Sequence, residues 1–108
     1  MNSTQYETCI RECYTCAQAC DQCFAACLTE EDATKMARCV KLDADCSAVC
    51  RLAAAYMARS SEFARQICDL CAEVCEECGQ ECAKFQSSHC QHCASICNDC
   101  AQACRAMA

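Results

Sequence analysis

Cysteine is the residue type whose number and spacing stand out in this sequence. Nineteen of the 108 residues are cysteine, and they fall into four groups in which the steps alternate between three and four residues. The second group keeps this rhythm if Asp43 fills the gap between Cys39 and Cys46. In chain order, the groups are Cys9, Cys13, Cys16, Cys20, Cys23, Cys27; then Cys39, Cys46, Cys50; then Cys68, Cys71, Cys75, Cys78, Cys82; and finally Cys90, Cys93, Cys97, Cys100, Cys104. Thiolates gathered in this way are ligands for soft metal ions.

Cysteine-rich chains of this size are more often secreted scaffolds stapled by disulfides. Three features oppose that interpretation: the cysteine count is odd, the period is helical where stapled domains are rich in loops, and the chain opens on a polar stretch without the apolar run of a signal peptide. In a reducing compartment, dense cysteine indicates metal binding instead. We therefore expect a cytoplasmic metal-binding protein.

Helices must hold these cysteines, because alternating steps of three and four residues place them on one face of a helix that packs against other helices. The sequence has one glycine and no proline, which allows long helices. Start signals are Thr4 with Glu7, Asp32, Ser60 or Ser61, and Ser88 with Gln91. We expect helices at about 4–28, 32–58, 62–85 and 88–106. Short connections predict an all-α, antiparallel up-down-up-down four-helix bundle with a cysteine-lined core, in one domain over residues 1–108.

The spacing also favours a particular metal. Residues three or four apart on a helix have Cβ atoms about 5–6 Å apart, whereas a disulfide requires about 3.8 Å. Two metal–sulfur bonds of about 2.3 Å place sulfurs up to about 4.6 Å apart, which suits a nearly linear ion such as Cu(I). Several Cu(I) ions per chain are therefore expected. The helical pairs are Cys9/Cys13, Cys16/Cys20, Cys23/Cys27, Cys46/Cys50, Cys71/Cys75, Cys78/Cys82, Cys93/Cys97 and Cys100/Cys104, which leaves Cys39, Cys68 and Cys90 for sites shared between helices.

Other metals and chemistries fit this cysteine pattern less well than copper. Zinc requires four ligands, so the thiols would hold only about four or five ions; metallothionein-like sequestration of zinc or cadmium remains the alternative. Iron–sulfur clusters also take four thiolates, and no isolated reactive cysteine indicates a redox enzyme. A purely structural role is disfavoured, because thiols fill a core poorly beside leucine. We expect no catalysis.

An antiparallel bundle assigns a different chemistry to each of its ends. One end gathers the apolar side chains of Tyr6, Met57, Phe63 and Met107 and is expected to be plugged. The other end, which we call the mouth, gathers Cys27, Met36, Cys39, Cys82, Phe85, His89, Cys90 and His92. His89, His92 and Met36 are candidate ligands where copper enters, against the alternative that each histidine is a surface residue. Asp43 is a weaker candidate, because a carboxylate is a hard ligand for Cu(I).

The remaining composition restricts the partners. The net charge is −6 with mixed signs, so no basic patch suits nucleic acid, and no apolar stretch approaches the length of a membrane span. A second apolar stripe runs beside the cysteines, either as packing between helix flanks or as a subunit interface. It comprises Ile10, Tyr14, Ala17, Phe24, Leu28, Leu42, Val49, Leu52, Tyr56, Phe63, Ile67, Leu70 and Val74.

The complete cysteine pattern resembles that of the bacterial copper storage proteins, which are cysteine-rich four-helix bundles. The resemblance rests on the runs Cys9–Cys27, Cys68–Cys82 and Cys90–Cys104 and on the sparser Cys39, Cys46, Cys50. It implies the cytosolic branch of the family, a homotetramer of bundles, and cores filled with Cu(I) mainly through cysteine pairs. It also implies a histidine near the open mouth, which His89 and, as a second candidate, His92 match. A copper chaperone or a small thiol would be the copper donor.

Overall fold

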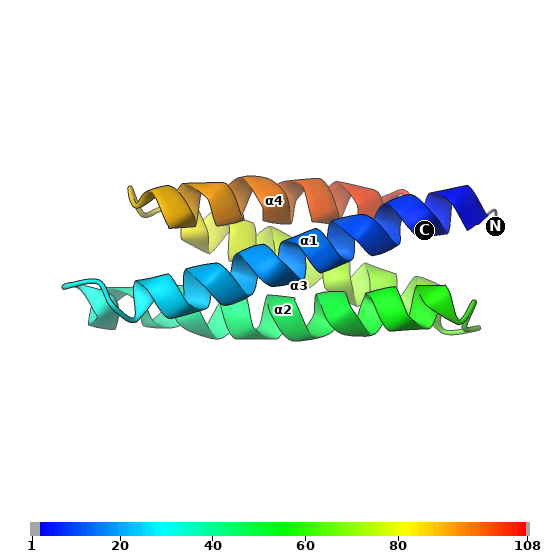
Figure 1. Ribbon diagram of the computed structural model, residues 1–108, viewed down its shortest axis with the longest axis horizontal. Helices are drawn as coiled ribbons and strands as arrows, with labels where there is room; N and C mark the ends of the chain where they lie inside the picture. The colour runs from blue at the N-terminus through cyan, green and yellow to red at the C-terminus, as the bar shows by residue number, and fades with distance from the viewer. Residues whose placement is uncertain (1–2, 108) are drawn as a thin grey trace.

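The computed structural model describes residues 3–107, with side chains from residue 6 onward, and within that range it contains helices and no strands. The helices are α1 (Ser3–Cys27), α2 (Ala37–Ala58), α3 (Ala64–Cys82) and α4 (Ser88–Arg105), and a short 3-10 helix, η1 (Ala33–Met36), precedes α2. Each long helix runs antiparallel to the next, and α4 closes the bundle against α1 (Figure 1). The bundle measures 46 × 17 × 17 Å. The predicted all-α four-helix bundle is confirmed.

The helix starts and their capping hydrogen bonds differ from the sequence-based expectations. The second long helix begins at Ala37 and not near residue 32, because residues 33–36 form η1; Asp32 precedes η1 but makes no capping hydrogen bond with its side chain. The third long helix begins at Ala64 with Phe63 as its N-cap, so the N-cap expected at Ser60 or Ser61 is wrong. The Ser61 Oγ instead accepts a hydrogen bond from the amide of Phe63 at 3.0 Å, just before the helix. The capping box expected at Ser88 and Gln91 is wrong.

Gln91 instead serves the preceding helix. Its side-chain amide donates to the carbonyl oxygens of Ala83 and Phe85, at 3.1 and 2.6 Å. These carbonyls lie just beyond the C-terminus of α3, where backbone acceptors have no partner within the helix. Gln91 therefore ties the end of α3 to the start of α4. The capping expected of Thr4 lies outside the described side chains.

The core consists of sulfur and small side chains. All the cysteines are buried, each 1% exposed or less, and they are accompanied by buried alanines such as Ala17, Ala53 and Ala72. Larger apolar residues of the second stripe, including Ile10 and Leu42, are only partly buried at the flanks. The cysteines thus occupy the positions along the bundle axis that leucine and isoleucine normally fill in a helical seam.

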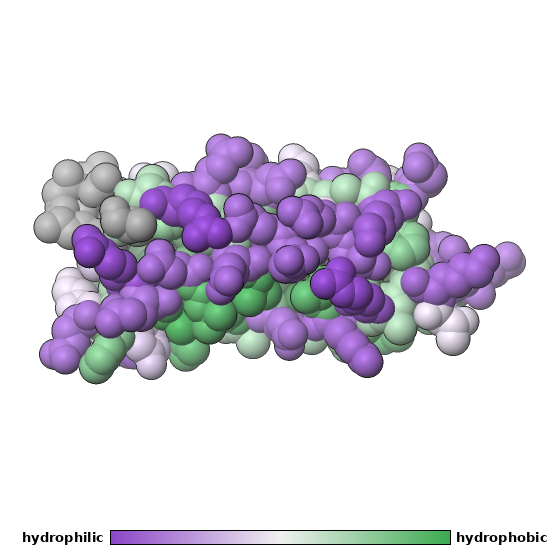
Figure 2. All heavy atoms as spheres, turned by 180° about the vertical axis from the view of Figure 1, so that it is seen from behind, coloured by the Kyte–Doolittle hydropathy of each residue, from purple (hydrophilic) through white to green (hydrophobic). Residues whose placement is uncertain are grey.

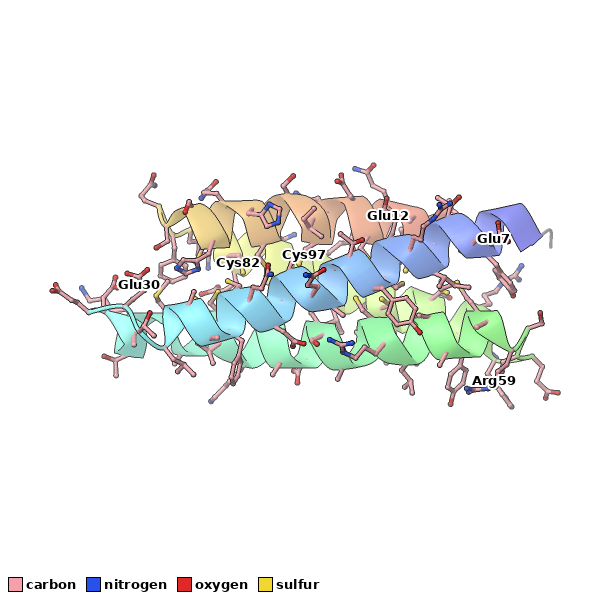
Figure 3. The ribbon with its side chains drawn as sticks, in the orientation of Figure 1. Glu7, Glu12, Glu30, Arg59, Cys82 and Cys97 are labelled. Carbon is pink, nitrogen blue, oxygen red and sulfur yellow. The ribbon has the colours of Figure 1, made fainter. Side chains whose placement is uncertain are left out.

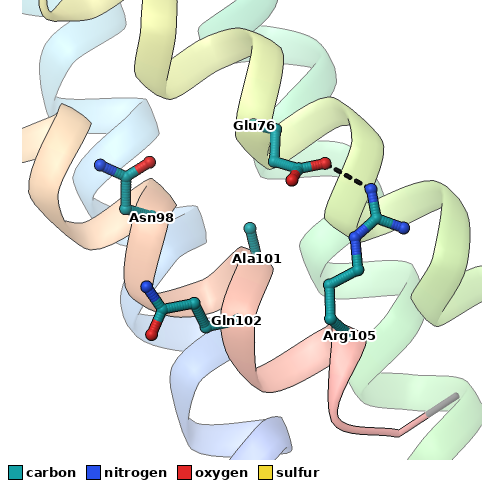
Figure 4. Close-up of a pocket in the computed structure, with 5 residues that line it drawn as sticks. All are labelled: Glu76, Asn98, Ala101, Gln102 and Arg105. Atoms are coloured by element: carbon teal, nitrogen blue, oxygen red, sulfur yellow. Dashed lines mark hydrogen bonds and ion pairs between the residues drawn. The ribbon is translucent and has the colours of Figure 1, made fainter.

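Ion pairs on the outside join neighbouring helices. Arg51 of α2 pairs with Asp21 of α1 at 2.7 Å, and Arg38 of α2 pairs with Glu81 of α3 at 2.9 Å. Arg105 of α4 pairs with Glu76 of α3 across a shallow polar hollow on the surface (Figure 4). Exposed pairs contribute at most about 1 kcal/mol each, so the buried helix faces, more than these contacts, hold the bundle together.

Gly79 permits the close approach of α3 to α4. A Cβ atom built at this position would lie 3.2 Å from the Asn98 side-chain oxygen, 3.3 Å from the Cys97 Cβ and 3.4 Å from the Ala94 carbonyl oxygen. Two of these three neighbours are atoms fixed by the α4 backbone and cannot rotate away. The absence of a side chain thus offsets the cost of about 1 kcal/mol that glycine carries within a helix.

Replacing Gly79 with valine should destabilise the empty protein by about 1–3 kcal/mol, because the added branches overfill the contact between α3 and α4. The exposed neighbour Gln80→Val is the matched control, since it introduces the same branched side chain into the same helix without facing α4. Urea unfolding of both variants measures the difference. Equal stability of the two variants would show that the contact at Gly79 is not tight.

Candidate metal centre

The nineteen thiols come together along the axis of the bundle (Figure 3). Sulfurs of different helices are as close as sulfurs of one helix: Cys39 and Cys82 are 3.1 Å apart, Cys46 and Cys75 are 3.5 Å apart, and Cys27 lies 3.7 Å from Cys90. All of these are free thiols. One continuous column of sulfur therefore runs between the helices.

The helical pairs expected from the sequence have the spacing that a bridged metal requires. In five of them the two sulfurs lie within 4.0 Å of each other, which is inside the reach of about 4.6 Å allowed by two metal–sulfur bonds. The Sγ–Sγ distances are 3.7 Å for Cys23/Cys27, 4.0 Å for Cys46/Cys50, 3.8 Å for Cys71/Cys75, 4.0 Å for Cys78/Cys82 and 3.9 Å for Cys93/Cys97. Small adjustments of χ1 would bring each pair onto one ion.

Groups of four thiols from two or more helices also converge, with all ligand atoms within 4.8 Å of one another. These groups overlap, since Cys16, Cys46 and Cys97 each belong to more than one of them. They include Cys13, Cys71, Cys100, Cys104; Cys16, Cys46, Cys50, Cys75; Cys16, Cys20, Cys46, Cys97; Cys20, Cys78, Cys93, Cys97; and Cys23, Cys27, Cys39, Cys90. Overlapping groups suit thiolates that bridge several ions better than separate tetrahedral sites.

Asp43 is the one carboxylate within this column among the described residues. It is fully buried, and its oxygens accept hydrogen bonds from the thiols of Cys78 at 3.2 Å, Cys82 at 3.5 Å and Cys93 at 3.5 Å. Burial, followed by repulsion from a Cys93 thiolate, raises the pKa of Asp43 to about 8. The empty protein therefore holds this group mostly as the neutral acid near pH 7.

Two thiols near the mouth, those of Cys27 and Cys90, are held in the neutral form in the same way. Burial raises the pKa of the Cys90 thiol to about 11, and it also raises the pKa of Cys27. Many bare thiolates in one dry column would repel each other strongly. Ionisation of the column therefore requires cations that enter as protons leave.

His89 closes the mouth of the column. It is the second residue of α4, and its side chain is 22% exposed. Its Nδ1 lies 3.5 Å from the sulfur of Cys90, 3.7 Å from Cys23 and 4.0 Å from Cys27. The structure thus brings the predicted histidine to three of the predicted cysteines.

The other candidates at the mouth are placed differently. His92 is exposed on α4 and has none of these contacts within the described residues. Met36, the last residue of η1, is buried in the same cluster as the cysteines. At the opposite end Met57 and Met107 are buried, Tyr6 is partly buried, and Phe63 is 55% exposed and so contributes little to the plug. Sequence reasoning missed Glu30, which contacts His89 from the connection after α1; no motif marks it.

Comparisons with known proteins agree with this geometry. A profile described as copper storage protein matches residues 2–108. A Cu(I)-bound copper storage protein, BsCsp3, superimposes with a TM-score of 0.92 at 44% identity, over 96% of this chain and 98% of that chain. The uncharacterized cysteine-rich protein YhjQ of Bacillus subtilis is 45% identical over 83 residues, or 77% of each chain.

A second group of solved structures comes from Streptomyces lividans. Its cytosolic copper storage protein, described with five coppers, has a TM-score of 0.92 at 37% identity and covers 98% of this chain and 96% of that chain. The Streptomyces protein loaded with 10 copper equivalents gives a TM-score of 0.95 at 38% identity, over 98% and 85% of the two chains. The present chain belongs to the copper storage protein family, as its resemblance had indicated.

The buried acid gives the empty protein a testable pH dependence. The unfolded chain ionises Asp43 above its ordinary pKa of about 3.9, whereas the folded chain retains the proton up to about pH 8. The stability that this group contributes is therefore present below about pH 4 and is lost as the pH rises towards 8, at roughly 1 kcal/mol per pH unit.

Asp43→Asn should remove this loss in the metal-free, reduced protein. Urea unfolding at several pH values from 5 to about 8 is expected to show wild type falling relative to the variant. Asp45→Asn, an exposed carboxylate two residues away, is the control that leaves the slope unchanged. Parallel curves for wild type and Asp43→Asn would contradict a raised pKa at this position.

Proposed function

We propose that this chain stores many Cu(I) ions in the sulfur column inside its bundle and performs no catalysis. The observation that carries this proposal is the overlap of the thiol groups, in which the sulfurs of Cys16, Cys46 and Cys97 each serve two neighbouring sites. A thiolate that bridges two ions suits Cu(I), which accepts two or three soft ligands. Residues 1–108 act as one copper-binding domain.

Charge balance supports a monovalent ion over zinc or cadmium. One Cu(I) for each thiolate leaves the filled column neutral, whereas four thiolates around one divalent ion leave two negative charges at each site. Repeated along a buried column, that excess would be costly. The present family relationship and the Cu(I)-bound relative point the same way.

The ligands in this proposal are all nineteen cysteines, together with His89 at the mouth and Asp43 within the column. The helical pairs provide most of the two-coordinate sites, and contacts between helices provide the shared ones. Met36 is close enough to the column to be retained as a weaker candidate. The exposed position of His92 leaves it as a candidate for transient copper binding at the surface only.

Storage of this kind requires a reducing compartment, because free thiols must persist. We propose a cytoplasmic location, in keeping with the Streptomyces relative that is described as cytosolic. No helix in the described part of the chain is long and apolar enough to cross a membrane. A copper chaperone or a small thiol would deliver Cu(I), and neither nucleic acid nor a membrane is required.

Anaerobic titration of the reduced protein with Cu(I), against a competing chelator, should give tight binding on the order of one ion per thiol, since each ion uses two thiolates and each thiolate can bridge two ions. The same titration with Zn²⁺ serves as the comparison and should saturate at about four or five ions. Saturation with Cu(I) at five or fewer ions, with Zn²⁺ competing effectively, would rule out bulk copper storage.

An apolar face outside the bundle supports assembly into a homo-oligomer. Leu52 and Leu70 remain 46% and 47% exposed, and they line one shallow groove between α2 and α3 with Val49 and Val74. Tyr56 and Phe63 extend the groove towards the end of α2. Figure 2 shows this face as a green patch among polar side chains. A second copy offers an identical apolar face and would cover it by two-fold symmetry. Because that contact is fully used within the dimer, the tetramer proposed here also needs a second, different interface between dimers.

Charges placed in this groove should dissociate the assembly without unfolding the bundle. We expect wild type to have the mass of a tetramer by light scattering, and Leu52→Glu/Leu70→Glu to have a smaller mass with unchanged helical circular dichroism. Gln18→Glu, an exposed change on α1, is the control. A monomeric wild type, or a double variant that keeps the wild-type mass, would exclude this interface.

A further inference from the structure

Glu30 holds the imidazole of His89 from the side opposite the thiols. Its Oε1 lies 2.9 Å from the Nε2 of His89, while the Nδ1 of the same ring faces Cys90, Cys23 and Cys27. The two ring nitrogens therefore meet different partners, a carboxylate on the outside and sulfur on the inside. Glu30 lies at the mouth end of the bundle, in the connection that follows α1 (Figure 3).

The connection around Glu30 is itself fixed by hydrogen bonds. Its backbone amide donates to the Cys27 carbonyl at 3.2 Å, and its carbonyl accepts from the Ala33 amide at 3.2 Å. The Ser87 hydroxyl donates to the Glu30 carboxylate at 3.4 Å, from the residue before α4. The carboxylate is thus anchored both to the end of the helix that carries Cys23 and Cys27 and to the start of the helix that carries His89.

A carboxylate can only accept a hydrogen bond, so a neutral His89 that pairs with Glu30 must carry its proton on Nε2. The lone pair then resides on Nδ1, which is the nitrogen that faces the three thiols. We propose that Glu30 is a positioning residue that fixes this tautomer and ring orientation, and so makes Nδ1 of His89 a ready ligand for the first Cu(I) bound by Cys23, Cys27 and Cys90. A carboxylate behind a ligating histidine also increases the basicity of the ring.

This inference rests on the proposed storage function, because it concerns the mouth of the same sulfur column. It assigns to Glu30 an effect on the affinity of the mouth and none on the capacity of the column, since Glu30 offers no ligand to the deeper sites. Loss of a carboxylate behind a ligating histidine typically lowers metal affinity by about 10–100-fold. Glu30→Ala should show a weakening of that size for the mouth alone.

The first experiment examines the metal-free protein by ¹⁵N NMR of its histidine side chains, above the ordinary imidazole pKa of about 6.5. Nitrogens with and without a proton have well-separated shifts. We expect His89 to show a single Nε2-protonated form that becomes a tautomer mixture in Glu30→Ala. The exposed His92 is the internal reference, and Glu31→Ala is the matched control that should leave His89 unchanged. Identical His89 spectra in wild type and Glu30→Ala would overturn the proposal.

The second experiment measures Cu(I) affinity by chelator competition at low loading and total capacity at saturation. Glu30→Ala and His89→Ala should each weaken the first ion bound, the double variant should be no weaker than His89→Ala, and all should reach the wild-type capacity. If Glu30→Ala lowered the Cu(I) affinity equally in the wild type and in His89→Ala, Glu30 would not act through the His89 imidazole. A low Cu(I) capacity of the wild type would refute the storage function instead. The NMR experiment on the metal-free protein would still test the role of Glu30 independently.

Discussion

The structure depends on one electrostatic constraint: a buried column of sulfur can carry negative charge only where cations balance it. Burial limits the charge in the empty column, because it keeps groups such as the Cys90 thiol and the acid of Asp43 protonated. Filling then exchanges protons for metal, site by site. Because each ion stabilises the folded chain over the unfolded chain by mass action, loading and stability rise together. The protein is thus a scaffold whose interior is completed by its cargo.

The same constraint explains where the large apolar side chains lie. In an ordinary bundle, leucine and isoleucine fill the axis; here cysteine and alanine occupy it, and Gly79 lets α3 and α4 approach closely. The larger residues move to the flanks, where Leu52 and Leu70 stay half exposed. The apolar surface that could be buried along the axis of an ordinary bundle is therefore exposed on the outside of this one, where a second molecule can cover it. An apolar outer face and a sulfur-lined interior are two consequences of one arrangement.

The period of the cysteines was enough to predict the bundle, its antiparallel order and the meeting of Cys27, Cys39, Cys82 and Cys90 at one end, because a repeat of three and four residues fixes which face of each helix is buried. The contacts at the helix ends were harder to predict than the buried faces. Gln91 was expected to cap its own helix and instead reaches back to α3. Glu30 could not be found at all, because its contact with His89 joins the connection after α1 to the first turn of α4, 59 residues further along the sequence. The cysteine column can therefore be predicted from patterns within helices, whereas the mouth also depends on tertiary contacts of the loops that no sequence pattern reveals.

Ligand chemistry changes along the column in a consistent direction. Nitrogen from His89 lies at the mouth, and the oxygen of Asp43 contacts Cys39, Cys78, Cys82 and Cys93, which all belong to the half nearest the mouth. The other half, around Cys13, Cys50, Cys71 and Cys104, offers sulfur alone. Sulfur is the softer ligand and binds Cu(I) more tightly than nitrogen or oxygen. The deeper half is therefore lined with the softest ligands for holding Cu(I), whereas the mouth adds a nitrogen, held in place by Glu30, that helps Cys23, Cys27 and Cys90 to capture an arriving ion.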